Sequence, residues 1–240
     1  MNVLQNLPQV VTAIGGLGTA AFGLLDAIKS VIPWINHIGF GRIHGTVSSL
    51  TPEGGEAKLP VNALPEKDIV DSLLANWMNG TELKSQKAIA KTLIRLHLSE
   101  ANAKALAAAT NVDGDLLTSV AGKTIAGKSL AQDESDVFSR FDLIVTARLD
   151  EAYQHADQVY RNWTRGLAAV IAVLLAVVGG WTLAAEVVPV AGAQAASFWQ
   201  SKELFQAILV GLLATPLAPI AKDISSALAT AVNTMQLVKK

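Results

Sequence analysis

One stretch of the chain matches a pattern with defined chemistry. Residues 122–129 are Gly-Lys-Thr-Ile-Ala-Gly-Lys-Ser, which fits the phosphate-loop pattern G-x-x-x-x-G-K-[ST]. In such a loop, backbone N–H groups near Gly122 and Gly127 would surround phosphates together with Lys128, and the Ser129 hydroxyl would bind Mg²⁺. The pattern makes nucleotide binding one hypothesis for this chain.

The surroundings of this motif favour a different interpretation. A phosphate loop follows a buried strand, but residues 116–121 are weak as a strand, and no second apolar strand ends in an aspartate that could bind magnesium. We therefore expect a helix C-terminus at Gly122, a turn through Gly127, and a cap for the next helix at Asp133 or Asp136.

The remaining polar motifs do not form a catalytic or metal site. Asn111, Asp113 and Asp115 alternate as at the start of a calcium loop, but the glycine and glutamate that such a loop needs further on are missing, which favours helix capping. The four histidines do not pair at i, i+3 or i+4, so no metal is expected; they are His37, His44, His97 and His155. Asp150, Glu151 and Asp157 lie on the polar side of the helix expected over about 134–165, where contact with water accounts for their charge without a catalytic role. No cofactor is expected.

Three glycines lie just beyond the first apolar segment. Gly39, Gly41 and Gly45 have the spacing G-x-G-x-x-x-G, which departs from the dinucleotide-binding fingerprint. We expect a flexible exit turn here. The alternative is that residues 34–45 form a re-entrant or interfacial segment that lines a pore.

The composition is that of a membrane protein. The 240 residues are 51% hydrophobic and only 16% charged, with a mean hydropathy of +0.37, whereas about a quarter of a soluble domain is charged. A balance of 19 basic and 20 acidic residues, with no basic cluster, argues against a nucleic-acid partner. The absence of cysteine excludes disulfides, thiolate zinc sites and iron–sulfur clusters.

Three segments are long and apolar enough to cross a bilayer core of about 30 Å, namely residues 8–32, 166–185 and 204–221. Pro216 and Pro219 should kink the third. Basic residues near span ends tend to stay in the cytoplasm, and they flank the central segment and the C-terminus. We therefore expect a bacterial inner-membrane protein with the N-terminus outside, the central domain and the C-terminus in the cytoplasm, and the 187–203 loop outside.

These spans divide the chain into four regions. Residues 1–41 form an N-terminal transmembrane helix with its exit turn, 42–165 a cytoplasmic helical domain, 166–221 a transmembrane hairpin, and 222–240 a C-terminal amphipathic helix. In the second region we expect a glycine- and proline-rich loop with one strand near 43–50. Short helices follow, one with Ile69, Leu73, Leu74 and Trp77 on a stripe that ends at Asn79 and Gly80, one capped by Thr81 and one starting at Ser99.

Apolar residues recur every three or four positions at the end of the central domain. This heptad-like seam predicts a stalk helix over about 134–165 that continues into the second span. Its partner is either the domain's own short helices or the same helix of another subunit. The seam residues are Phe138, Phe141, Val145, Leu149, Ala152, Ala156, Val159 and Trp163.

Small residues on the first span predict contacts between helices. Gly16, Thr19, Ala20 and Gly23 form small-x-x-x-small pairs, which let helix backbones approach closely in lipid. Together with the seam and the lack of a catalytic constellation, they predict an all-α, homo-oligomeric membrane protein, embedded in the bilayer, that acts as a scaffold or a pore. A gated ion channel and a membrane-anchored nucleotide-binding protein are the alternatives.

Overall fold

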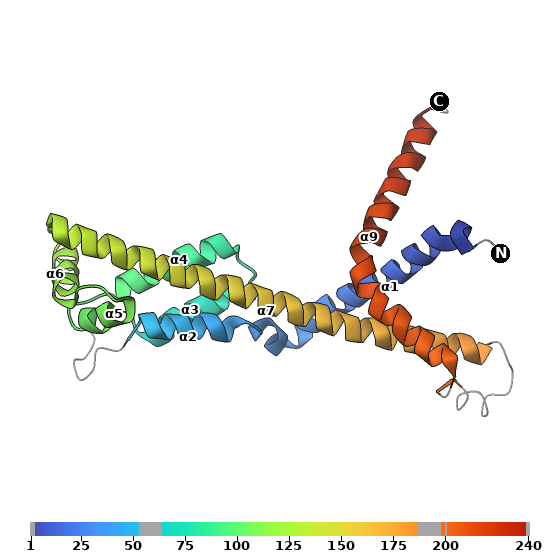
Figure 1. Ribbon diagram of the computed structural model, residues 1–240, viewed down its shortest axis with the longest axis horizontal. Helices are drawn as coiled ribbons and strands as arrows, with labels where there is room; N and C mark the ends of the chain where they lie inside the picture. The colour runs from blue at the N-terminus through green and yellow to red at the C-terminus, as the bar shows by residue number, and fades with distance from the viewer. Residues whose placement is uncertain (1–2, 53–63, 187–197, 200, 239–240) are drawn as a thin grey trace. The chain divides into compact units, whose positions relative to one another are not determined.

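The computed structural model describes residues 3–52, 64–186, 198–199 and 201–238, and no strand occurs among them (Figure 1). Two compact units are present: a central unit, Pro33–Tyr160, and an apolar unit made of Met1–Ile32 and Arg161–Lys240. The helices in chain order are α1 (Val3–Val31), the 3-10 helix η1 (Pro33–His37), α2 (Phe40–Leu50), α3 (Glu66–Met78), α4 (Leu83–His97), α5 (Ala103–Thr110), α6 (Gly114–Ile125), α7 (Gln132–Glu186) and α9 (Lys202–Val238).

The apolar unit contains three helices that are long and apolar enough to cross a membrane, as the sequence predicts. They are α1, the second part of α7, and α9. Large apolar side chains on their outer surfaces are exposed in the chain itself, including Leu174 (59%), Phe205 (63%) and Leu212 (52%). Large apolar side chains exposed along segments of this length suit contact with lipid.

Helix α7 is a single helix of 55 residues, about 80 Å long at 1.5 Å per residue. The predicted stalk helix therefore does continue without interruption into the second apolar segment. Helix α9 is also longer than its apolar segment, because it passes through Pro216 and Pro219 and ends at Val238. Residues 222–238 thus extend α9 rather than forming a separate helix. Each proline removes only one backbone bond, so the helix bends instead of ending, as Figure 1 shows.

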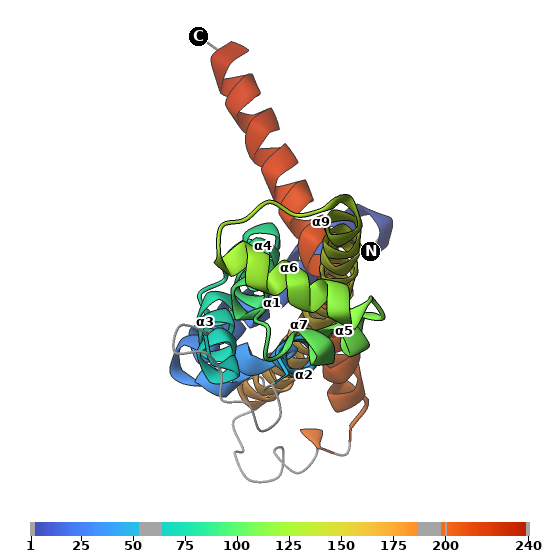
Figure 2. The ribbon, with the colours of Figure 1, turned by 90° about the vertical axis from the view of Figure 1, so that its left-hand side faces the viewer.

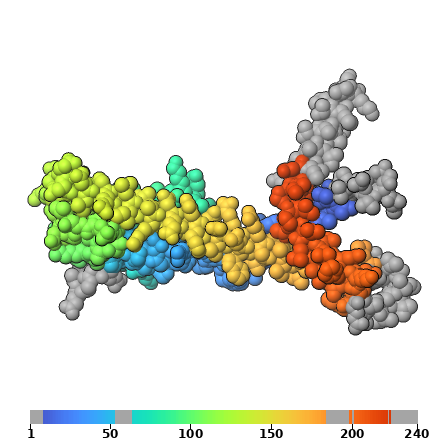
Figure 3. Space-filling view, viewed as in Figure 1, coloured from blue at the N-terminus to red at the C-terminus, as the bar shows by residue number. Residues whose placement is uncertain are grey.

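In the central unit, α2 to α6 pack around the first part of α7. The core includes Ile43 and Val47 of α2, Leu73 of α3, Ile94 of α4 and Leu149 of α7, all at most 1% exposed. The surface of α2, light blue in Figure 3, lies against that of α7, in yellow. Helices α5 and α6 pack against each other and face the viewer in Figure 2.

The strand predicted near 43–50 is wrong, because these residues belong to α2. Ile43, Val47 and Leu50 are fully buried at the spacing i, i+4, i+7, which is the helical period. The β-branched Ile43 and Val47 favour a strand locally, but their burial against the other helices of the unit outweighs this preference.

Several helix ends differ from the predictions. Asn79 and Gly80 end α3 as expected, with Gly80 at φ 67°. Thr81 does not cap α4: its hydroxyl donates to Asn76 Oδ1 at 3.3 Å, and Glu82 is the N-cap residue. Helix α5 begins at Ala103 rather than near Ser99, because Asn102 Oδ1 accepts the Ser99 N–H and Asn102 Nδ2 donates to the His97 carbonyl.

Some predictions fall outside the described residues. The glycine- and proline-rich loop at 53–63 and most of the loop at 187–203 are among them, as are the side chains of the C-terminal amphipathic pattern.

Candidate functional site

The three helices of the apolar unit meet at small residues. Ala21 of α1, Ala172 of α7 and Ala214 of α9 are fully buried in one cluster, with Leu17 and Ile171 packed at its edge. Alanines at a crossing let the helix axes approach closely, and in lipid this close packing replaces the hydrophobic effect as the main source of helix association. These contacts tie α1, α7 and α9 together within one chain.

Two glycines of α1 make the closest contacts with α9. A Cβ atom on Gly18 would lie 2.1 Å from the carbonyl oxygen of Ala214, and one on Gly15 would lie 2.8 Å from that of Leu217. The Cα hydrogens of both glycines therefore point at backbone carbonyls, an arrangement that recurs at helix–helix interfaces. Gly15 meets Leu217, whereas Gly18, further along α1, meets the earlier residue Ala214 of α9. The two helices therefore run antiparallel.

Gly211 has the same role between α9 and α7. A Cβ atom there would lie 2.4 Å from Val173 Cα, so only glycine fits at this crossing. Gly180 of α7 is less restricted, since its nearest neighbours, in Phe198 and Ala207, lie 3.4 Å or more from a Cβ position. Gly211 and Gly180 thus contribute to packing inside the chain.

The small-residue face predicted on α1 lies opposite the packed one. Gly16 and Gly23 have no atom within 4 Å of a Cβ position, and Thr19 and Ala20 are exposed. The Thr19 hydroxyl donates to the Gly15 carbonyl at 3.1 Å, which satisfies it within its own helix. We call Gly16, Thr19, Ala20 and Gly23 the open face; no described residue of the chain covers it.

The sequence alone does not distinguish the packed side of α1 from the open face, and it does not mark Gly18 as a packing residue. The signal lay on the partner helix, where Ala214, Ala218 and Ala221 repeat at the spacing i, i+4, i+7 and form a small-residue stripe that matches Gly15 and Gly18.

The heptad-like seam of α7 is filled by the chain itself. Phe141, Val145, Leu149, Ala152 and Ala156 are at most 1% exposed, and Phe138 and Val159 are partly buried. Of the two partners that the spacing left open, the structure provides the short helices of the central unit. Side chains that are already buried in one subunit leave little surface for a second one, so a contact between subunits through the seam stays a prediction. Trp163 is the seam residue that is largely exposed, at 57%.

Residues 122–129 form the end of a helix. Gly122 lies inside α6, which ends at Ile125 rather than at Gly122, and Gly127 turns the chain with φ 66°. The N–H of Lys128 donates to the Lys123 carbonyl at 2.8 Å and that of Gly127 to Thr124 at 3.2 Å, which is the Schellman pattern of hydrogen bonds. These N–H groups are used by the helix end and do not point at a phosphate. Lys128 and Ser129 are exposed.

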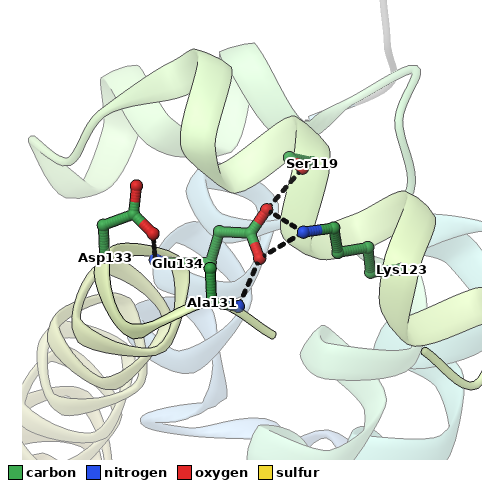
Figure 4. Close-up of polar contacts among 5 residues, drawn as sticks. All are labelled: Ser119, Lys123, Ala131, Asp133 and Glu134. Carbon is green, nitrogen blue, oxygen red and sulfur yellow. Dashed lines mark hydrogen bonds and ion pairs between the residues drawn. The ribbon is translucent and has the colours of Figure 1, made fainter. Parts of the chain in front are cut away.

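Glu134, and not Asp133 or Asp136, organises the start of α7 (Figure 4). Its carboxylate accepts hydrogen bonds from Lys123 Nζ at 2.6 and 2.7 Å, from Ser119 Oγ at 2.6 Å and from the Ala131 N–H at 2.7 Å. The last of these is the reciprocal bond of a capping box. The bonds from Lys123, then those from Ser119 and Ala131, lower the pKa of Glu134 to about 2. Lys123, the first of the two lysines in the motif, therefore joins α6 to α7.

Ion pairs join α4 to α7. Asp142 accepts from Lys91 Nζ at 2.6 Å and also pairs with Arg95, while Asp150 accepts from Lys87 Nζ at 2.5 Å. The expectation that solvation alone accounts for Asp150 and Glu151 is thus incomplete, because Glu151 also lies 3.6 Å from Arg42 of α2. These contacts position helices and form no catalytic arrangement.

His97 is the one fully buried histidine among the described residues, and its surroundings explain it structurally. Its Nδ1 lies 2.9 Å from the Leu64 carbonyl oxygen, and its Nε2 lies 3.4 Å from that of Pro52. Both ring nitrogens thus face backbone acceptors.

Comparison with known proteins adds no further assignment: no protein family, no curated protein and no solved structure matches this chain.

Proposed function

We propose that the protein is a homo-oligomeric bacterial inner-membrane protein that acts as a scaffold or as a pore-forming assembly. The observation that carries the proposal is the open face of α1. Gly16, Thr19, Ala20 and Gly23 form a surface of small side chains on an apolar helix whose opposite side packs against α9 and α7.

No described residue of the subunit packs against the open face. Glycine costs about 0.5–1 kcal/mol relative to alanine in the interior of a helix. At Gly15 and Gly18 the close approach of α9 offsets this cost, but Gly16 and Gly23 have free space around their Cα atoms. A second helix packed against this face would make use of both glycines, because small residues four or three positions apart let two backbones approach.

Lipid contact supports the membrane part of the proposal. Exposure of the apolar side chains of α7 and α9 to water would be unfavourable. These side chains belong to helical segments that are long enough to span a bilayer. The positions of Lys and Arg near the ends of the spans favour an orientation in the membrane with the N-terminus outside and the central unit and C-terminus in the cytoplasm. Arg161 and Arg165 precede the apolar part of α7, on the side that the basic residues assign to the cytoplasm.

The proposal is tested by counting subunits in lipid nanodiscs by mass photometry. The wild type should be oligomeric, and Gly16→Leu combined with Gly23→Leu should reduce the subunit count. Gly166→Leu is the matched control, because Gly166 is also an exposed glycine of an apolar helix with nothing within 4 Å of its Cβ position. A wild type that is monomeric would overturn the proposal.

A pore conducts ions across the membrane, whereas a scaffold does not. Ion flux into liposomes that contain the wild type, lost in the Gly16→Leu, Gly23→Leu variant, would identify the pore. Sealed liposomes with an intact oligomer would identify the scaffold.

A further inference from the structure

A groove lies between α2 and α7, entirely within the central unit. Its volume is about 440 Å³, which is in the range of small-molecule sites. Gly41, Gly45 and Arg42 of α2 and Arg148 of α7 line it. Thr46, Ser49 and Glu151 complete the lining.

The two glycines are not required by the fold. A Cβ atom on Gly41 or Gly45 would meet nothing within 4 Å, and neither residue is among those with positive φ. Glycine is the poorest helix former apart from proline, yet two of the eleven residues of α2 are glycines on the groove side. Their effect is to keep the groove open and to leave the helix backbone accessible to a bound group.

The charged groups of the groove are available for a ligand. Among the described residues, Arg148 has no carboxylate or hydrogen-bond partner, and the 3.6 Å pair between Arg42 and Glu151 is exposed on both sides, at 57% and 72%. An exposed pair of this length contributes little and is easily exchanged for another anion. The groove therefore offers two guanidinium groups against one carboxylate, a net positive charge.

A hydroxyl donor is also free. Ser49 Oγ donates to the Thr46 carbonyl, and Thr51 Oγ1 to the Val47 carbonyl, as is usual for hydroxyls in helices. Thr46 Oγ1 has no such bond among the described contacts, although the carbonyl of Arg42 lies one turn before it. Its hydroxyl can thus donate to a group in the groove.

We propose that this groove binds a phosphomonoester group, carried by a soluble small molecule or by a lipid headgroup. Guanidinium groups match phosphate oxygens with paired, charge-assisted hydrogen bonds, and Arg148 and Arg42 supply two of them. Thr46 supplies the hydroxyl donor, and Gly41 and Gly45 let the phosphate approach the helix. The proposal is independent of the oligomer proposed above, because none of these residues belongs to α1.

The test uses the full-length protein in nanodiscs of phosphatidylcholine, with glycerol 3-phosphate as the soluble probe and calorimetry as the measurement. Binding should weaken about tenfold or more in Arg148→Gln, which loses the unpaired guanidinium, and in Gly45→Leu, which fills the groove. Arg140→Gln is the matched control, since Arg140 is an exposed arginine of the same helix without a partner among the described residues, and it should bind as the wild type does. Thermal unfolding of each variant checks that the central unit is folded.

A second arm distinguishes the source of the phosphate. Discs that contain phosphatidic acid present the same group on a lipid, and native mass spectrometry counts the lipids that stay bound. Retention by the wild type but not by Arg148→Gln, without binding of glycerol 3-phosphate, would assign the phosphate to a lipid. The proposal is overturned if neither probe binds at about 10 mM, if folded Arg148→Gln and Gly45→Leu bind as the wild type does, or if Gly45→Leu changes only the subunit count, which would make the groove a contact between copies.

Discussion

Gly18 of α1 lies directly against the backbone of Ala214 in α9, so that a Cβ atom at position 18 would come 2.1 Å from the Ala214 carbonyl oxygen. This contact fixes which side of α1 faces the rest of the chain. The open face, two residues earlier at Gly16, is turned away from it as a direct consequence of the helical period.

Gly18→Leu should loosen the packing of α1 on α9, because the side chain cannot be placed without separating two backbones. We expect a loss of about 1–3 kcal/mol in the free energy of unfolding, measured by denaturant titration in detergent. Gly16→Leu changes the same residue type two positions away and should leave this stability nearly unchanged. Equal losses in both variants would mean that α1 does not pack through Gly18.

Phe141 tests whether the seam of α7 is filled by its own subunit. Its side chain is fully buried in the core of the central unit, so Phe141→Ala should lower the free energy of unfolding by about 3–5 kcal/mol. The subunit count of the folded protein should stay the same. A variant that dissociates while the central unit keeps its stability would place the seam between subunits instead.

Asp142 should contribute more to stability than an exposed carboxylate does. Its side chain is 18% exposed and contacts both Lys91 and Arg95, so Asp142→Asn leaves two cations of α4 facing a neutral group. A loss of about 1–2 kcal/mol is expected for this partly buried network. Asp115→Asn is the control: Asp115 and Lys104 of its ion pair are 88% and 73% exposed, and solvent screening should make the loss of stability much smaller than for Asp142→Asn.

Glu134 makes the central unit sensitive to acid. The hydrogen bonds from Lys123, Ser119 and Ala131 lower its pKa to about 2, below the value of about 4.3 in an unfolded chain. Its contribution to stability is therefore fully present above about pH 4.3 and is lost as the pH falls toward 2. Thermal midpoints measured from pH 6 to pH 2 should fall more steeply for the wild type than for Glu134→Gln. Parallel curves would show that Glu134 is not paired as described.

The long helices could be predicted because their signals are local. The spacing from Phe138 to Val159 persists over several turns without glycine or proline, and the structure confirms one continuous helix through this region. The length of each apolar segment similarly identified three helices that are long enough to cross a membrane. Both predictions depend on properties that a single helix carries by itself.

The errors concern choices made by tertiary contacts. Ile43 and Val47 favour a strand by residue type, but the surrounding helices bury them at helical spacing. Glu134 caps α7 instead of a neighbouring aspartate because Lys123 and Ser119 of another helix also bind its carboxylate. Gly16 and Gly18 look equivalent in the sequence, and only the position of α9 separates a packed glycine from an exposed one.

The most direct test of the proposed assembly is the mass of the wild type and of its Gly16→Leu, Gly23→Leu variant in nanodiscs. We expect an oligomer for the wild type, and fewer subunits for the variant at unchanged thermal stability of the central unit. A wild type that is monomeric at every lipid composition, or a variant with an unchanged subunit count, would contradict the role of the open face of α1.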